Sequence, residues 1–188
     1  MRSHSSGGWR LVVPVAFLVG AVAAPALAYH WHNGGWRDRH YNYPPKPSGY
    51  SQIVNVFGQP CTDRSNANSF IWKAADNDVW YTVNFHRKLG GSVSSNLNND
   101  VRGHIGNAHL DWAVNHGIWG YNCRDTRSGG STSTHAWGIA VDVSSAEEYA
   151  GKCHSTANKY HAQIWKDHRW TWGLAWCDPM HFQYASNY

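Results

Sequence analysis

Two short segments, Ser133-Thr-His-Ala-Trp-Gly-Ile-Ala-Val-Asp142 and Asp178-Pro-Met-His-Phe-Gln183, decide how the C-terminal part of this chain folds. Residues 139–143 alternate between two faces, which is the period of a β-strand. The three β-branched residues share one face, and Ala140 and Asp142 share the other. Because the aliphatic face is expected to pack into the core, the carboxylate of Asp142 is expected to point into a cleft.

The second segment alternates in the same way, and its polar face completes a candidate metal site. His181 and Gln183 share one face of a closing strand, which a sheet can bring beside Asp142. His135 lies seven positions before Asp142 and can reach the same place, because Gly138 lets the chain bend between them. Two imidazoles and one carboxylate are the ligands of a catalytic zinc ion that leaves a fourth position open for water.

An acid close to the last histidine adds a function to this site. Asp178 lies three positions before His181 and is placed to take the proton of a zinc-bound water. Taken singly, each histidine or aspartate is more often a packed or surface group than a ligand. The combination of residue types, spacing and strand phase is much more specific, and it predicts a metallohydrolase.

The paired motif also carries a family resemblance. The stretches Ser133-x-His-Ala-Trp-Gly-x-Ala-x-Asp142 and Asp178-Pro-Met-His-Phe182 resemble the zinc-dependent peptidoglycan peptidases of the D-alanyl-D-alanine carboxypeptidase and L-alanyl-D-glutamate endopeptidase family, peptidase family M15. The resemblance covers roughly residues 118–184. It implies one Zn²⁺ per chain with Asp178 as the general base. The ligands that it implies are His135, Asp142 and His181.

The residue type at position 178 bears on the type of reaction. The carboxypeptidase branch usually has glutamate where Asp178 stands, whereas aspartate is similar to the endopeptidase branch. This favours an endopeptidase modestly. The resemblance also implies an arginine upstream of the first ligand that stabilises the oxyanion. Arg124 fits that position best, and Arg127 is the alternative.

The resemblance therefore implies a zinc metallopeptidase that hydrolyses an amide bond in peptidoglycan stem peptides. The reaction is of the L-alanyl-D-glutamate endopeptidase or D,D-carboxypeptidase type, and the pocket loops leave the choice open. Two alternatives stand beside it: a non-catalytic cell-wall-binding or zinc-binding protein built on the same domain, and a zinc hydrolase of another substrate class.

The first 50 residues suggest export. Residues 1–28 have a basic start, an apolar run and an Ala-Leu-Ala end, which are typical of a cleaved signal peptide. A retained N-terminal anchor is the alternative. Residues 29–50 are rich in Gly, Pro and aromatic residues and are interpreted as a flexible linker, so that residues 51–188 form a zinc peptidase domain. We expect a monomer, secreted or associated with the cell wall, without stable membrane association after signal cleavage.

Charge and cysteines agree with this location. The net charge of +4 is mild, and no basic run is dense enough to favour nucleic acid as a partner. An even number of cysteines in an exported chain predicts two disulfides. The sequence does not choose among the three possible pairings of Cys61, Cys123, Cys153 and Cys177.

The rest of the chain predicts an α+β fold: one compact domain with a small antiparallel sheet that carries the zinc site and flanking helices. Strands are expected at residues 79–85, 118–123 and 139–143. A turn is expected at residues 90–95, and a helix follows with apolar residues at 97, 101, 105, 108 and 112. A second helix is expected to follow a cap at Ser144 or Ser145, with Glu147 and Glu148 in its first turn. It covers roughly residues 149–167, and Gly151 is a candidate break. Trp137, Trp172 and Trp176 flank the candidate ligands, and core packing is favoured over a role as cleft walls.

Overall fold

The structure of the chain, a computed structural model, describes residues 42–61, 67–73, 80–104 and 116–188. All of them belong to the compact unit Trp36–Tyr188. The expected signal peptide lies outside the described residues, as do most of the expected linker and the second half of the helix predicted after residue 95.

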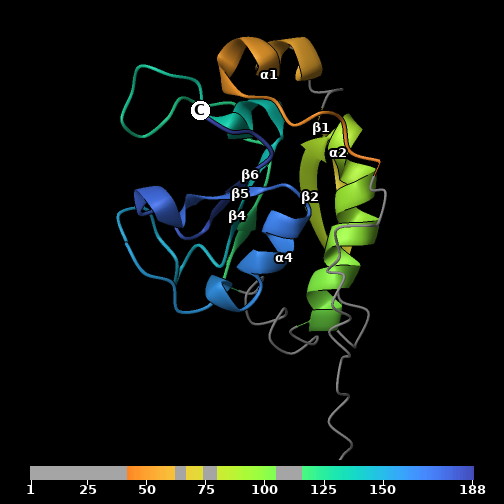
Figure 1. Cartoon of the computed structure of the whole chain (residues 1–188), viewed down its shortest axis with the longest axis vertical. Coiled ribbons are helices and arrows are strands. Elements are labelled where there is room, and N and C mark those ends of the chain that lie inside the picture. The colour runs from red at the N-terminus through yellow and green to blue at the C-terminus, as the bar shows by residue number, and fades with distance from the viewer. Residues whose placement is uncertain (1–41, 62–66, 74–79, 105–115) are drawn as a thin grey trace, which may run out of the picture. The chain divides into compact units, whose positions relative to one another are not determined.

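A four-stranded antiparallel sheet carries the polar residues of the two motifs. Its order is β3-β4-β6-β5 (Figure 1). The strands are β3 (Ile118–Trp119), β4 (Ala140–Val143), β5 (Thr171–Trp172) and β6 (His181–Gln183). In its register Asp142 lies opposite Trp119 on one side and His181 on the other. The predicted meeting of the two motif strands is therefore confirmed, whereas the strand expected at 118–123 has only two residues.

The aliphatic face of β4 packs into the core as predicted. Ile139, Val141 and Val143 are fully buried. The short helix α4 (Ala162–Asp167) packs beside the sheet, and its Trp165 stacks on Phe182 of β6 with ring centroids 4.5 Å apart. This contact fixes the inner face of the strand whose outer face carries His181.

The N-terminal elements form a second layer. An antiparallel pair, β1 (Ala67–Lys73) and β2 (Trp80–His86), is preceded by α1 (Gly49–Phe57) and followed by α2 (Arg87–Ser92) and the π-helix η3 (Val93–Leu97). Figure 1 shows α2 running alongside β1 and β2. The mixture of helices with small antiparallel sheets confirms the α+β class.

The turn predicted at residues 90–95 is wrong, because helix begins at Arg87 and continues to His104. The reason is an apolar row that starts earlier than expected: Leu89, Val93, Leu97 and Val101 are all fully buried. A strict spacing of four drifts by about 40° per step on an α-helix, and the wider winding of the π turn realigns the row. This row outweighs the pair of glycines at 90 and 91.

The long helix predicted at residues 149–167 is also wrong in its first half. Only the 3₁₀ turn η5 (Asn158–Tyr160) and α4 are helical. The buried carboxylate of Glu148 instead accepts main-chain N–H bonds from Thr156, Ala157 and Asn158. An acid that suggested the first turn of a helix thus anchors an irregular loop.

Both predicted disulfides form, with the pairing Cys61–Cys123 and Cys153–Cys177. The first joins the end of the α1 region to the residue before Arg124. The second joins the Glu148 loop to the residue before Asp178. Disulfides of this kind fit an oxidising compartment.

Residues 42–50 belong to the folded domain rather than to the expected linker. The hydroxyl of Tyr43 lies 3.1 Å from Nδ1 of His168, and Lys46 Nζ donates to the Thr171 hydroxyl at 2.6 Å. The Tyr184 hydroxyl donates to the Pro44 carbonyl at 2.7 Å. Within the described residues, no helix is long and apolar enough to cross a membrane.

Candidate metal centre

Three side chains from three elements converge on one point. Asp142 and His181 come from paired positions of β4 and β6, and His135 comes from the 3₁₀ turn η4 (Thr134–Trp137). Gly138 follows that turn with a φ of 68°, and a Cβ there would lie 2.7 Å from the His86 main-chain nitrogen. Only glycine allows this close return of the chain into β4.

The distances fit a tetrahedral ion. Oδ1 of Asp142 lies 3.1 Å from Nε2 of His135 and 3.0 Å from Nδ1 of His181, and the two nitrogens are 3.3 Å apart. Zinc bonds of about 2.0–2.1 Å at tetrahedral angles place ligand atoms roughly 3.3 Å from one another. All three residues are buried, and together they form a group that can hold a metal ion.

The outward-facing nitrogens fix how each ring presents its lone pair. Nδ1 of His135 is 2.6 Å from the Gly120 carbonyl oxygen, which can only accept, so this nitrogen donates. Nε2 of His181 lies 3.0 Å from Oε1 of Gln183, whose amide nitrogen donates to the main-chain oxygen of Tyr188. Both outer nitrogens therefore carry the proton, and both inner nitrogens present lone pairs.

The inward-facing atoms are thus three acceptors with no proton among them. Such a group is unfavourable unless a cation lies between its members. Although burial opposes it, the hydrogen bonds and charges of His135 and His181 hold the pKa of Asp142 below its usual range. Burial would lower the pKa of His181, but the bond to Asp142 and the charge of that carboxylate raise it. The site attracts positive charge, either a proton or a metal ion.

Asp178 lies beside this group. It follows the 3₁₀ turn η6 (Gly173–Trp176), and its main-chain oxygen accepts from the His181 N–H at 3.1 Å. Burial and the charge of Asp142 raise its pKa, against the opposing charges of His181 and Arg127. Its Oδ1 is buried without a hydrogen-bond partner among the described residues. A carboxylate oxygen of this kind is available to a proton or a water molecule.

Two cavities of about 550 Å³ each adjoin the candidate ligands. The first, called here the hydroxyl cavity, is lined by Asp178, His181 and the hydroxyl groups of Thr126, Ser128, Ser131 and Tyr188. The second, called the tryptophan cavity, is lined by His135, Asp142, Trp119, Tyr121, Asn122 and Asp125. Since the ligand set is divided between them, the two cavities flank the candidate metal site.

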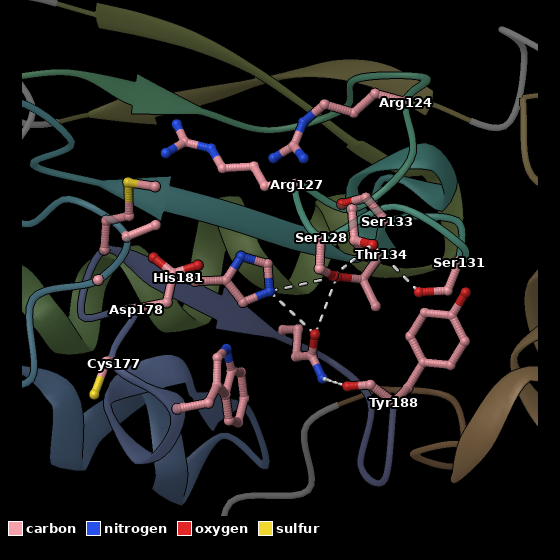
Figure 2. A pocket seen from close by; sticks show the side chains of 16 residues that line it. Arg124, Arg127, Ser128, Ser131, Ser133, Thr134, Cys177, Asp178, His181 and Tyr188 are labelled. Atoms are coloured by element: carbon pink, nitrogen blue, oxygen red, sulfur yellow. Dashed lines mark hydrogen bonds between the residues drawn. The ribbon is translucent and has the colours of Figure 1, made fainter.

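Arg124 and Arg127 line both cavities. In Figure 2 their guanidinium groups lie on the side of the hydroxyl cavity away from Tyr188. Arg124 donates to the Asp125 carbonyl at 3.2 Å, and the charge of Arg127 acts on Asp178. The structure therefore brings both candidate arginines to the site and leaves the choice between them open.

Some residues that support the candidate ligands were not predicted from the sequence. Gln183 and Thr134 support His181, and the Thr134 hydroxyl donates to Oε1 of Gln183 at 3.0 Å (Figure 2). The position of Gln183 on the same strand face as His181 was a usable signal. Ser133 contacts the main-chain N–H of His135 rather than its ring. Trp137 is a core residue, as favoured, with its indole N–H bound to the Gly58 carbonyl.

Comparison with known protein families gives a match to the C-terminal part of the chain. The family model described as D-alanyl-D-alanine carboxypeptidase, among the M15 peptidases, matches residues 126–184. This stretch contains the three candidate ligands and Asp178, whereas Arg124 precedes it. No curated protein and no solved structure matches the chain.

Proposed function

We propose that the protein is a secreted, monomeric zinc peptidase that hydrolyses an amide bond in peptidoglycan stem peptides, since residues 126–184 match a family model of the M15 peptidases. The observation that carries the proposal is the arrangement of three buried lone-pair donors next to Asp178, whose Oδ1 has no hydrogen-bond partner within the described part of the chain. Coordination of a metal ion explains why the three lone pairs face one another. Proton transfer explains why a carboxylate, that of Asp178, lies beside them. The two disulfides support export.

The proposed ligands are His135, Asp142 and His181. A zinc ion held there would lower the pKa of a bound water toward about 7 and polarise a substrate carbonyl. Gly120 and Gln183 keep the two imidazoles in the tautomers that this role requires.

Asp178 would act as general base and then as general acid. Its buried Oδ1 has no hydrogen-bond partner among the described residues, so this oxygen is free to accept a proton and to release it again. It would take a proton from the attacking water and deliver it to the leaving amine. One of the two arginines would offset the negative charge on the carbonyl oxygen, a contact typically worth about 3–4 kcal/mol in the barrier.

The test is mass spectrometry of peptidoglycan fragments incubated with zinc-loaded protein. Wild type should give defined products, and Asp178→Asn should slow their formation by about 10²- to 10⁴-fold while zinc stays bound. Asp167→Asn is the matched control, because Asp167 lies on α4 and bonds Gln163 away from both cavities. Unchanged turnover in Asp178→Asn would overturn the assigned base. No product from wild type with one zinc bound would favour a binding protein.

A further inference from the structure

The tryptophan cavity contains an exposed aromatic residue next to the candidate ligands. Trp119 is 63% exposed although it lies in a strand. It is the direct partner of Asp142 in the β3–β4 pair. Directly opposite residues of an antiparallel pair point to the same face, with Cβ atoms about 4.5–5.5 Å apart. The indole therefore stands beside the metal site, on the face that carries it.

The indole is held in place although it is exposed. Its Nε1 donates to the Ser145 hydroxyl at 3.0 Å. Ser145 is itself tied to the Gly117 carbonyl through its main-chain nitrogen. A Cβ at Gly117 would lie 2.3 Å from that hydroxyl, so glycine is needed for the serine to approach. A fixed, open ring face is a low-entropy platform for a ligand.

The polar groups around the platform differ from those of the other cavity. Asn122 and Asp125 line the tryptophan cavity and are exposed, providing amide and carboxylate groups. A flat apolar face with such groups at its edge suits a sugar ring, which has an apolar C–H face and a rim of hydroxyl and acetamido groups. The hydroxyl cavity contains Trp176 too, but Asp178 and a row of serine, threonine and tyrosine hydroxyl groups dominate its wall, which suits a peptide better.

We propose that Trp119 binds a sugar ring of the glycan strand, so that the enzyme recognises stem peptides still attached to it. This rests on the proposed function and deepens it by assigning the bond. The sugar is joined to the first residue of the stem, and an extended chain advances at most about 3.6 Å per residue. A sugar on Trp119, one strand away from Asp142, places the bond between the first two stem residues at the metal site. The enzyme would then be an L-alanyl-D-glutamate endopeptidase.

The experiment compares two substrates of the full, zinc-loaded protein: a disaccharide-linked stem peptide and the same peptide without sugar. Trp119→Ala should lower kcat/KM for the disaccharide-linked substrate about 10- to 100-fold, as for a typical aromatic anchor. The value for the free peptide should change less than about twofold. Trp119→Phe should keep part of the preference. Tyr160→Ala is the control, since Tyr160 is 59% exposed and lines neither cavity.

Equal losses on both substrates would overturn the proposal, because the indole would then contact the peptide or support the site. So would an unchanged Trp119→Ala, or release of only the terminal D-alanine. Zinc affinity of each variant separates a folding defect from lost recognition, and Ser145→Ala, which frees the indole, should weaken the sugar preference without altering zinc binding. If wild type cuts neither substrate, the proposed function fails. Titration with the free disaccharide then tests Trp119 alone, with binding lost in Trp119→Ala as the supporting result.

Discussion

Replacing Gln183 with leucine should weaken zinc binding without touching a ligand. Gln183 is 3% exposed, and its Oε1 accepts from Nε2 of His181 at 3.0 Å. Leucine keeps the volume but removes the acceptor. Among the residues that the structure describes, the only other partner of that nitrogen is the Thr134 hydroxyl at 3.4 Å, near the limit of a hydrogen bond.

The size of the effect follows from the tautomer. A buried N–H left without a partner costs about 1–3 kcal/mol. That cost falls on the tautomer in which Nδ1 of His181 is free to coordinate. Zinc affinity should therefore fall about 10- to 100-fold, the range found when such outer contacts are removed. Gln183→Glu keeps an acceptor and should retain most of the affinity.

The assay is competition for zinc between the protein and a chromophoric chelator at fixed pH. Gln163→Leu is the matched control, because Gln163 is exposed and bonds only Asp167 in the described structure. If Gln183→Leu binds zinc within twofold of wild type, the tautomer assigned to His181 is wrong, and with it the lone-pair geometry of the site.

Three further outcomes are expected. Gly120→Ala should reduce zinc affinity, since a Cβ there would lie 2.2 Å from the Asn84 carbonyl and would displace the Gly120 oxygen that accepts from His135. The same competition assay measures this affinity, and an unchanged value would contradict the prediction. Burial and the charge of His104 lower the pKa of His161 to about 3. The unfolded chain therefore takes up this proton first, and stability should fall by about 1.4 kcal/mol per pH unit as pH drops from about 6.5 toward 3. Denaturant titrations at several pH values measure this, and the free energy of unfolding should depend less steeply on pH in His161→Gln than in wild type. Reduction of Cys153–Cys177 should lower turnover more than zinc affinity, because it frees the residue before Asp178; parallel rate and binding measurements that fall equally would contradict this.

The sequence predicts the strands that carry the candidate ligands better than it predicts the helices and loops around them. The phase of residues 139–143 places Asp142 on the face of β4 opposite the aliphatic core face, and the pairing with His181 follows from two short strands with polar faces. The hydrogen bond between His135 and the Gly120 carbonyl was not predictable, because every residue has a main-chain oxygen and the sequence does not show which one accepts. The loop around Glu148 was misjudged for a related reason: its acid has the spacing of a helix start, and only the three-dimensional contacts show what it binds.

The helical segment after β2 shows that turn-forming residues alone do not decide secondary structure. Two adjacent glycines and three serines suggest a turn, yet one buried row of aliphatic residues runs through them. Burial of a side chain such as Leu89 is worth about 1.5–3 kcal/mol, which exceeds the cost of about 1 kcal/mol for a glycine in a helix. Tertiary contacts therefore decide the element, and these cannot be weighed from the local pattern alone.

The contacts of residues 42–50 determine how the domain can be shortened. Tyr43 and Pro44 contact His168 and Tyr184, which flank β5 and β6, and Lys46 contacts Thr171 of β5. A truncated protein that begins at residue 51 would lose all three contacts and would loosen the sheet edge next to His181. An affinity label or fusion partner should therefore be joined upstream of residue 42, where it leaves this attachment intact.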